Sequence, residues 1–200
     1  MVSFTESAIA ATAQMRTLFP ATPLQKNEYL SGIYGAEIYL KREDLSPVRS
    51  YKIRGAFNAM RKALEAGESR QFVCASAGNH AQGVAFACAH FGVKGRIYMP
   101  VTTPQQKIGK TAAFGGQSIE IILQGDYFDE TLAAANEYAA KHGAHMLPPF
   151  DDVDVIEGQA SVGVEILEQL GQSPDMIVIP VGGGGLSSGL VQYSDGCDVD

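Results

Sequence analysis

The sequence predicts an α/β fold in which a parallel sheet is flanked by helices. Three features indicate it: short apolar runs of strand length alternate with amphipathic stretches of helical length, glycine or proline marks the boundaries, and 46% of the 200 residues are hydrophobic. A chain of this length and composition can bury one good-sized core. Strands that alternate with single helices favour a parallel sheet with right-handed crossovers.

Four strands and three helices are expected to form one unit that begins at Gln71. The strands are short apolar runs over residues 71–75, 96–99, 118–123 and 144–147. Amphipathic helices are expected in the gaps between them, over 79–91, 104–114 and 127–141. Gly92 is typical of a C-terminal stop for the first helix, and Pro104 suits the first position of the second.

Further elements are expected on both sides of this unit. A strand over 36–41 precedes it, followed by a turn-rich loop and a helix that begins near Ile53. A helix over 154–170 follows it, and then a strand over 176–181 that ends in four consecutive glycines. A buried helix is expected to start at Leu186.

The last residues do not continue this pattern. From Tyr193 to Asp200 the chain turns polar and acidic and carries no helical stripe, so the helix is expected to stop there. We therefore expect helix 154–170 and strand 176–181 to expose apolar faces that nothing covers. Such exposure predicts oligomerisation or aggregation.

Composition argues against nucleic acid and membranes as partners. The chain has 22 acidic and 15 basic residues, and its lysines and arginines form neither a run nor a stripe. Residues 1–20 lack the basic and apolar regions of a secretion signal, and every apolar run is far shorter than the roughly 20 residues that cross a bilayer. Cys74, Cys88 and Cys197 show no metal-ligand spacing, so we expect no metal and a reducing cytoplasm.

A lysine lies at the expected start of the helix near Ile53, within Ser50-Tyr51-Lys52-Ile53-Arg54-Gly55. A lysine in such a place is usually a solvated surface residue. The alternative is a desolvated amine with a lowered pKa, which forms an imine with a carbonyl compound. The residues alone leave both interpretations open.

A second polar segment, Ser76-Ala77-Gly78-Asn79-His80, joins strand 71–75 to helix 79–91. Its amides and small side chains would surround a helix N-terminus, which suits a carboxylate or a phosphate. An ordinary N-cap is the alternative. A histidine in the first helical turn is more often a packing or hydrogen-bonding residue, so we expect no acid–base role for His80.

The glycine run joins the last expected strand to the last expected helix, and it comprises Gly182, Gly183, Gly184 and Gly185. Glycine permits positive φ angles and a close approach of the backbone to an anion. A tight, close-packed turn is the alternative. The run matches neither the dinucleotide fingerprint nor the P-loop, so it does not favour a nucleotide.

Taken together, these segments resemble the fold type II pyridoxal-phosphate enzymes, in the branch of threonine dehydratase, serine dehydratase and serine racemase. The resemblance runs from about Thr22 to Gly189 and rests on motifs in a fixed order: Thr22-Pro23-Leu24, Lys41-Arg42-Glu43-Asp44, Ser50-Tyr51-Lys52-Ile53-Arg54-Gly55-Ala56, Ser76-Ala77-Gly78-Asn79-His80-Ala81-Gln82-Gly83, Met99-Pro100 and Gly182-Gly183-Gly184-Gly185-Leu186. It implies a small α/β domain over 55–150, inserted into an incomplete large domain formed by 1–54 and 151–200.

The resemblance also implies a role for each of these segments. Lys52 would hold pyridoxal 5'-phosphate as an imine, with Tyr51 against the pyridine ring and Ser50 beside the phosphate. Asn79 would hydrogen-bond the phenolic oxygen of the cofactor. The phosphate would be cradled by the amides of Gly182, Gly183, Gly184, Gly185 and Leu186. The substrate carboxylate would be received by Ser76, Ala77, Gly78, Asn79 and His80.

The activity that the resemblance implies is deamination of L-threonine, and also of L-serine, to 2-oxobutanoate or pyruvate and ammonia. Lys52 would take the Cα proton, and an aminoacrylate would be released and hydrolysed. In the racemases that resemble this chain, a serine occupies the place of Ala77 and serves as an acid and base. Alanine cannot carry a proton, so we expect elimination without efficient racemisation. A serine racemase or a serine dehydratase is the alternative within the branch.

The chain departs from the family at its end. Members of the family continue far past the glycine loop, whereas the segment from about Gln192 matches nothing in them. The sequence is therefore expected to be truncated, and a non-catalytic fragment with a folded small domain is our second hypothesis. A homo-oligomer is expected, and the choice between isoleucine biosynthesis and amino-acid breakdown stays open.

Overall fold

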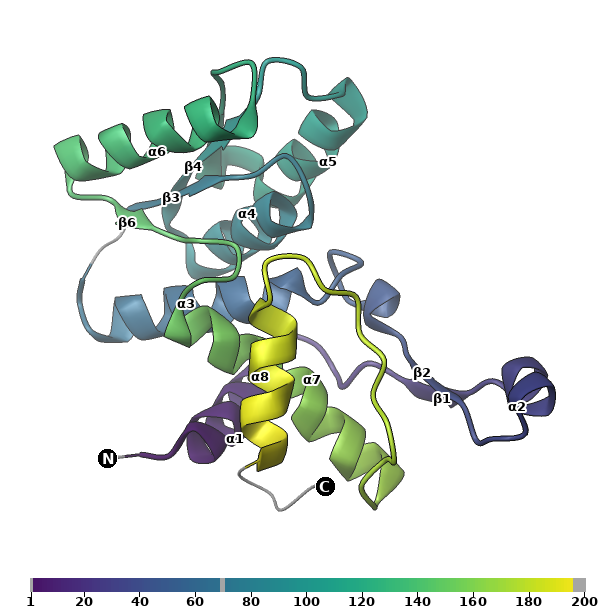
Figure 1. Cartoon of the computed structure of the whole chain (residues 1–200). Helices are drawn as coiled ribbons and strands as arrows, with labels where there is room; N and C mark the ends of the chain where they lie inside the picture. Colours follow the sequence, from purple (N-terminus) through teal and green to yellow (C-terminus); the bar gives the residue numbers. More distant parts are fainter. Residues whose placement is uncertain (1, 69–70, 196–200) are drawn as a thin grey trace.

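The computed structural model describes residues 2–68 and 71–195, and it contains a parallel four-stranded sheet (Figure 1). The strand order is β5 (Ile119–Leu123), β4 (Lys94–Met99), β3 (Gln71–Ala75) and β6 (His145–Met146). Each strand pairs in parallel with its neighbour. The expected α/β fold and the four expected strands are confirmed, with strand ends that move by at most two residues.

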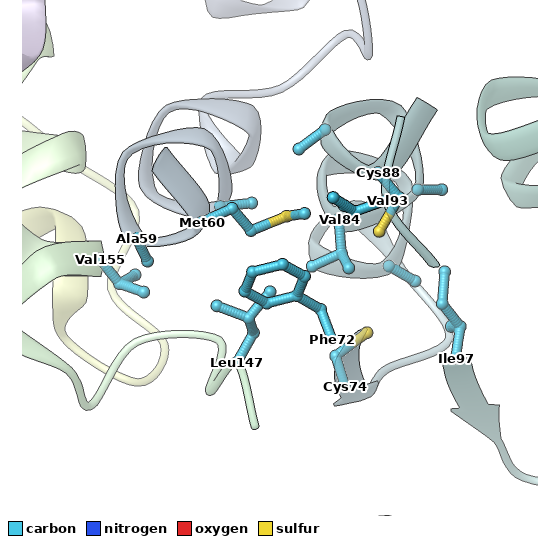
Figure 2. Close-up of a cluster of buried hydrophobic side chains, with 14 of the residues drawn as sticks. Ala59, Met60, Phe72, Cys74, Val84, Cys88, Val93, Ile97, Leu147 and Val155 are labelled. Atoms are coloured by element: carbon cyan, nitrogen blue, oxygen red, sulfur yellow. The ribbon is translucent and has the colours of Figure 1, made fainter. Parts of the chain in front are cut away.

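Three helices connect these strands and cover both faces of the sheet: α4 (Asn79–Phe91), α5 (Gln105–Gly115) and α6 (Phe128–His142). α4 begins and ends at the predicted residues. It ends at Phe91 because Gly92 takes the left-handed conformation, with φ of 64°, that stops a helix. Alternate side chains of β3 explain the two layers. Phe72 and Cys74 pack into the core that α3 and α4 cover (Figure 2), whereas Val73 and Ala75 pack against α6.

The order of the strands reverses once, next to β3. The chain runs from β3 to β4 and β5 in one direction, and α6 then returns it to β6 on the other side of β3. In open parallel sheets, ligands bind outside the carboxyl ends of the strands at such a switch point. The topology therefore points to the segments that follow β3 and β6.

Four helices form the second half of the molecule: α1 (Phe4–Met15), α3 (Lys52–Glu65), α7 (Val153–Leu170) and α8 (Gly185–Asp195). Figure 1 shows α1, α3 and α8 gathered around α7, and each packs against it. α7 is thus buried along most of its length, and the expectation that its apolar face would be exposed was wrong. Two of its neighbours explain the difference: α1 was not expected from the sequence, and α8 is longer than expected.

α1 was not expected from the sequence, although its start carries a recognisable signal. Ser3 and Glu6 form a capping box, in which each side chain accepts a hydrogen bond from the backbone of the other residue. Ala8, Thr12 and Met15 are buried at helical spacing. The pattern Ser-x-x-Glu before such a stripe predicts a helix start.

A small antiparallel pair and short helices complete the described fold. β1 (Leu24–Lys26) pairs with β2 (Tyr39–Lys41), so the strand expected over 36–41 exists but is shorter. α2 (Glu28–Tyr34) connects these two strands, and the 3-10 helices η1 (Glu43–Leu45) and η2 (Gly116–Ser118) precede α3 and β5. Among the described helices, none combines the length and the apolarity that a membrane crossing needs.

The strand expected over 176–181 is absent, and this prediction was wrong. The segment has no regular structure, and the side chains of Met176, Val178 and Val181 are 79%, 85% and 70% exposed. Ile177 and Ile179 alternate with Met176 and Val178 and pack against α7 and α8. The alternation of a strand is present, but no described segment pairs with this backbone, and a strand requires such pairing.

The expectation that the last helix stops before Tyr193 was also wrong. α8 continues to Asp195, and Tyr193 is buried in a cluster with Ala8 of α1 and Val164 of α7. Contacts with α1 therefore extend a helix whose own sequence turns polar. Residues 196–200, including Cys197, lie outside the described part of the chain.

Candidate active site

The candidate site lies where the carboxyl ends of β3 and β6 meet the first turn of α3. β3 runs into Ser76, Ala77 and Gly78, and β6 runs into the segment from Leu147 to Phe150. Both segments stand at the switch point of the sheet, the place where ligands bind in folds of this kind. The side chains that meet there come from distant parts of the sequence.

Lys52 is the first residue of α3, and its amine points into this region. Nζ donates a hydrogen bond of 2.6 Å to the carbonyl oxygen of Pro149 and lies 5.4 Å from the centre of the Tyr51 ring. The side chain is half-buried, and burial lowers the pKa of Lys52. An amine with a lowered pKa is unprotonated more often at neutral pH, which makes it a better nucleophile. The structure therefore favours the desolvated amine over a solvated surface lysine.

Ser50 and Tyr51 lead into Lys52 through a tight turn. Ser46 Oγ accepts a hydrogen bond from the backbone N–H of Ser50 and donates one to its carbonyl oxygen. Arg49 has a φ of 59°, in the left-handed region that few residues other than glycine adopt. The Ser50 hydroxyl is buried and has no hydrogen-bond partner within the described part of the chain. It is thus available to a ligand.

The N-terminus of α4 lies beside Lys52. A Cβ atom added to Gly83 would lie 3.1 Å from backbone atoms of Lys52, so the two helices nearly touch there. Asn79 is one turn before Gly83, on the same side of α4, and its side chain is exposed. Among residues 2–68 and 71–195, no side chain caps α4, and Ser76 Oγ accepts a 3.2 Å hydrogen bond from Gly78 N. An uncapped helix N-terminus with small neighbours can accept a carboxylate.

His80 ties α4 to the segment after β6. Its Nε2 lies 2.9 Å from the carbonyl oxygen of Leu147, and the ring is buried. Burial is the main cause that lowers the pKa of His80 to about 4; the hydrogen bond to Leu147 opposes this shift, and the nearby charge of Lys52 adds to it. A neutral imidazole at pH 7 donates this hydrogen bond through Nε2–H. The contact supports the structural role that the sequence analysis expected for His80.

The glycine loop reaches the same place from the other end of the chain. A Cβ atom on Gly183 would lie 2.1 Å from the Phe150 ring, and one on Gly185 would lie 3.0 Å from Phe150 Cα. Gly184 has a φ of 87°, which favours glycine. The loop packs against Phe150 with bare backbone and then opens α8. Such a backbone at a helix N-terminus is suited to binding an anion.

Pro149 and Phe150 are the shared contact that the sequence analysis did not single out. Lys52 binds the carbonyl of Pro149, and Gly183 and Gly185 pack on Phe150, so the amine and the anion loop flank one short segment. The turn Pro148-Pro149-Phe150-Asp151-Asp152, placed directly after a predicted strand, could have indicated it.

The arrangement fits a ligand that has both a carbonyl carbon and a phosphate. Lys52 offers an amine that can form an imine, the glycine loop offers bare backbone at a helix N-terminus, and Ser50 offers a free hydroxyl. Tyr51 also packs against a cluster that contains Leu186, so the ring and the end of the loop lie on the same side of α8. The structure thus brings together the lysine, the α4 N-terminus and the glycine loop.

A shallow hollow elsewhere on the sheet is not part of this site. It has a volume of about 270 Å³ and is lined by residues at the amino ends of the strands, among them Gln71, Lys94 and Ile119. This is the end of the sheet opposite to Ser76 and Pro149. Ligands of open parallel sheets bind at the carboxyl ends instead.

Comparison with known proteins shows the family that this chain resembles. The family profile described as "Pyridoxal-phosphate dependent enzyme" matches residues 16–195, which extends past Gln192, where the resemblance was expected to end. The chain is 48% identical over 183 residues to the L-threonine dehydratase biosynthetic IlvA of Mycobacterium leprae, covering 92% of this chain and 43% of that protein. This chain therefore spans less than half the length of that curated relative.

Two solved structures are similar in fold. The processed form of threonine deaminase isoform 2 from Solanum lycopersicum has a TM-score of 0.82 and 43% identity, covering 88% of this chain and 47% of that one. Maize serine racemase has a TM-score of 0.90 and 27% identity, covering 99% of this chain and 59% of that one. The fold therefore includes both deaminases and racemases, and substrate and reaction must be argued from the site.

Proposed function

The chain belongs to the family of pyridoxal-phosphate dependent enzymes, and from this premise we propose that its site serves the deamination of L-threonine. One observation carries the proposal: the amine of Lys52 and the bare backbone of the glycine loop flank the same segment, Pro149 to Phe150. An imine-forming amine and a phosphate loop at one place are what pyridoxal phosphate requires.

Each group in the site then has a role in binding. Lys52 would bind the cofactor covalently, and the glycine loop with the N-terminus of α8 would hold its phosphate beside the free hydroxyl of Ser50. Asn79 would donate to the phenolic oxygen from the start of α4. The substrate carboxylate would meet the amides of the segment from Ser76 to His80.

The chemistry divides between the cofactor and the protein. When bound, pyridoxal phosphate supplies an electron sink for the electron pair left when the Cα proton is removed. Lys52 Nζ takes that proton, and its half-buried position lowers the pKa of the amine, which favours the unprotonated form that the transfer needs. Elimination of water yields an enamine, and its hydrolysis returns one water and gives 2-oxobutanoate and ammonia. Serine would give pyruvate, since a pocket distinguishes one methyl group by only about 1–3 kcal/mol.

The test is direct. The purified chain is incubated with pyridoxal phosphate and L-threonine, and 2-oxobutanoate is followed by coupled oxidation of NADH. We expect product with the wild type and none with Lys52→Ala. A wild type that binds the cofactor but forms no 2-oxo acid would contradict the proposed activity and leave the cofactor site intact.

Ala77 leads to a prediction about stereochemistry. Its methyl group is half-buried and packs against the core cluster that contains Phe72, and it cannot hold a proton. We therefore expect elimination of L-serine to exceed formation of D-serine by at least about 100-fold, the usual scale of general acid–base catalysis. Chiral chromatography of the reaction mixture measures both products. Formation of D-serine at a rate comparable with pyruvate would contradict the role assigned to Ala77.

The exposed segment 176–181 favours a second candidate, a chain that binds the cofactor but does not turn over. Its outward side chains are exposed and its backbone pairs with no strand in the described part of the chain, although the segment leads directly into the glycine loop. A glycine loop that follows such a poorly packed segment could bind phosphate weakly. An absorbance band with pyridoxal phosphate but no 2-oxo acid identifies this candidate. Stabilisation by ATP or NAD alone would instead indicate a nucleotide site.

We also propose a domain division, an oligomeric state, a location and a pathway for the whole protein. We assign residues 55–150 to a small domain and 1–54 with 151–200 to part of a larger one, since the four-stranded sheet lies in the first range and α1, α7 and α8 in the second, whereas α3 begins at Lys52 and crosses the boundary. A homo-oligomer accords with the exposed apolar segment. A cytoplasmic location accords with the free thiols of Cys74 and Cys88. A role in isoleucine biosynthesis accords with the word "biosynthetic" in the name of the relative.

A further inference from the structure

Arg54 stands two residues after Lys52 and is fully buried. A cation in the first turn of a helix is unfavourable beside the positive end of the helix dipole, and α3 has neither an acidic residue in that turn nor a side-chain cap. The structure compensates the charge with two carboxylates, Glu43 and Glu165.

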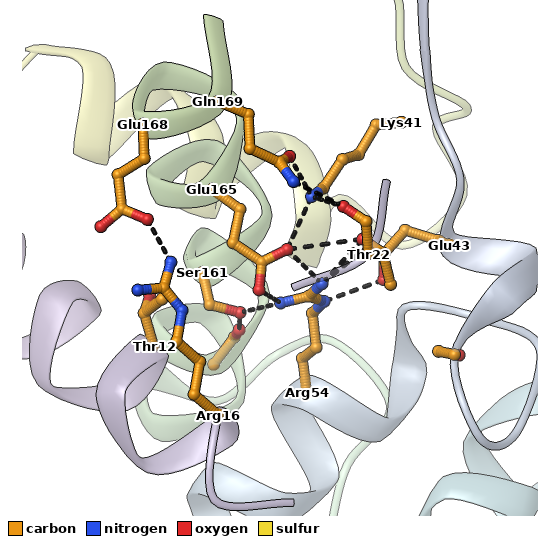
Figure 3. A network of polar contacts seen from close by, with 12 residues as sticks. Thr12, Arg16, Thr22, Lys41, Glu43, Arg54, Ser161, Glu165, Glu168 and Gln169 are labelled. Atoms are coloured by element: carbon orange, nitrogen blue, oxygen red, sulfur yellow. Dashed lines mark hydrogen bonds and ion pairs between the residues drawn. The ribbon is translucent and has the colours of Figure 1, made fainter. Parts of the chain in front are cut away.

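The guanidinium of Arg54 makes six hydrogen bonds to other described residues (Figure 3). Two of them run to Glu43, at 2.8 Å each, and two run to Glu165, at 3.0 and 2.8 Å. The others reach Ser161 and Thr22. Two carboxylates bound by one planar fork fix the position of a side chain far better than a point charge does.

The charges of this cluster are balanced. Burial alone would raise the pKa of Glu165, but the hydrogen bonds and charge of Arg54, and then those of Lys41, outweigh it and lower that pKa. Lys41 Nζ donates to Glu165 at 2.6 Å and to the carbonyl oxygen of Thr22 at 2.6 Å. Two cations thus face two carboxylates, and removal of one partner would leave an unpaired buried charge.

The cluster anchors α3 at the point where it touches α7. A Cβ atom on Gly158 would lie 2.4 Å from the carbonyl oxygen of Arg54, and one on Gly55 would lie 2.3 Å from Gln159 Nε2. The two backbones therefore meet directly beside Arg54. Lys52 binds Pro149, which precedes α7 by a few residues, whereas Arg54 binds Ser161 and Glu165 within α7. Lys52 and Arg54 thus fix α3 against two parts of the same stretch of chain.

We propose that Arg54 is a positioning residue for Lys52: its fork to Glu43 and Glu165 fixes the first turn of α3 and holds the amine at the carbonyl of Pro149. The inference rests on the proposed function only in treating Lys52 as the reactive lysine. Its structural content, that the fork controls the environment of the amine, is independent of whether a cofactor binds.

The test measures the amine itself, without cofactor. The chain is acetylated by a trace of acetic anhydride at a series of pH values, and the modification of Lys52 is quantified by mass spectrometry against the other lysine peptides. The midpoint of the reactivity curve reports the environment of Nζ. His80 of α4, whose pKa responds to the charge of Lys52, and Tyr51, whose ring lies 5.4 Å from Nζ, are retained in every variant.

Two substitutions separate the fork from its charge. Arg54→Met removes both, whereas Arg54→Lys keeps a positive charge but cannot bind two carboxylates bidentately. We expect both to move the midpoint upward, and the reactivity of Lys52 at pH 7, relative to its plateau at high pH, to fall about ten-fold. An Arg54→Lys variant with the wild-type midpoint would overturn the proposal, because charge alone would then suffice.

Lys62 provides the matched control. It also lies on α3 and also bridges to α7, through Asp154 and Glu157, but it sits near the other end of the helix. Lys62→Met should weaken the contact between the helices and leave the midpoint of Lys52 unchanged. An equal shift in this variant would mean that any loosening of α3 has the same effect, and would overturn the proposal.

A milder variant serves if the Arg54 substitutions do not fold. Glu43 accepts two of the bonds from Arg54 and is 15% exposed, so Glu43→Gln keeps its volume at a less buried position. We expect the midpoint to move in the same direction by a smaller amount. An unchanged midpoint in a folded Glu43→Gln chain would contradict the proposal. Binding of pyridoxal phosphate, measured separately, tests the proposed function.

Discussion

Gly158→Ala should destabilise the protein by about 3 kcal/mol, the upper end of the usual cost of overpacking a core. The added methyl would lie 2.4 Å from the carbonyl oxygen of Arg54 and 2.8 Å from Gly55 Cα. Both are backbone atoms within a helix, so neither can move aside without separating α3 from α7. Urea denaturation at a fixed protein concentration measures the free energy of unfolding.

Gly163→Ala is the matched control on the same helix. A Cβ atom there would lie 3.3 Å from the Tyr193 ring, a contact that a small shift of a side chain relieves. Alanine is also more favourable than glycine within a helix by about 1 kcal/mol. We therefore expect the free energy of unfolding of this variant to equal that of the wild type or to exceed it by up to about 1 kcal/mol. Equal unfolding midpoints for the two variants would show that the α3–α7 contact is not close.

Gly183→Ala should weaken the binding of pyridoxal phosphate about ten-fold or more, as expected for the loss of a charge-assisted hydrogen bond. The added methyl would lie 2.1 Å from the Phe150 ring, so either the ring or the loop must move. The loop would then no longer hold its N–H groups toward the site. Titration of the chain with the cofactor, followed by absorbance, gives the dissociation constant.

Gly182→Ala provides the comparison within the loop. Apart from its chain neighbours, no atom of the described residues lies within 4 Å of a Cβ added there, and Gly182 is not among the described glycines with positive φ. We expect the dissociation constant of this variant to stay within about three-fold of the wild type, which is less than 1 kcal/mol. Equal losses in both variants would indicate that Phe150 does not determine the shape of the loop.

Local signals explain which elements could be predicted from the sequence. Helix α4 ends at Gly92 because one residue with positive φ is enough to stop it, and the four strands of the sheet carry their own apolar runs. The segment 176–181 has such a run too, but pairing depends on a neighbour that no local pattern can supply. Tyr193 shows the converse, because burial against Ala8 extends a helix beyond its polar sequence.

The candidate site was predictable in its parts but not in its connections. The segments around Lys52, Asn79 and Gly183 stood out by composition, and the fold brings them to one place. Phe150 was overlooked because its importance comes from the bare glycines that pack on it. Arg54 lay within a recognised motif, yet its partner Glu165 is 111 residues away in sequence, so only the structure could reveal the fork.

Reduction of the chain with borohydride in the presence of pyridoxal phosphate tests the central claim most directly. Lys52 and the glycine loop, which flank Pro149 and Phe150, should form one site, so peptide mapping should find the reduced cofactor on Lys52 at close to one per chain. Lys52→Ala should lose this label, and Gly183→Ala should need more cofactor to reach it. Label spread over several lysines, with Lys52 no more modified than the rest, would contradict the account.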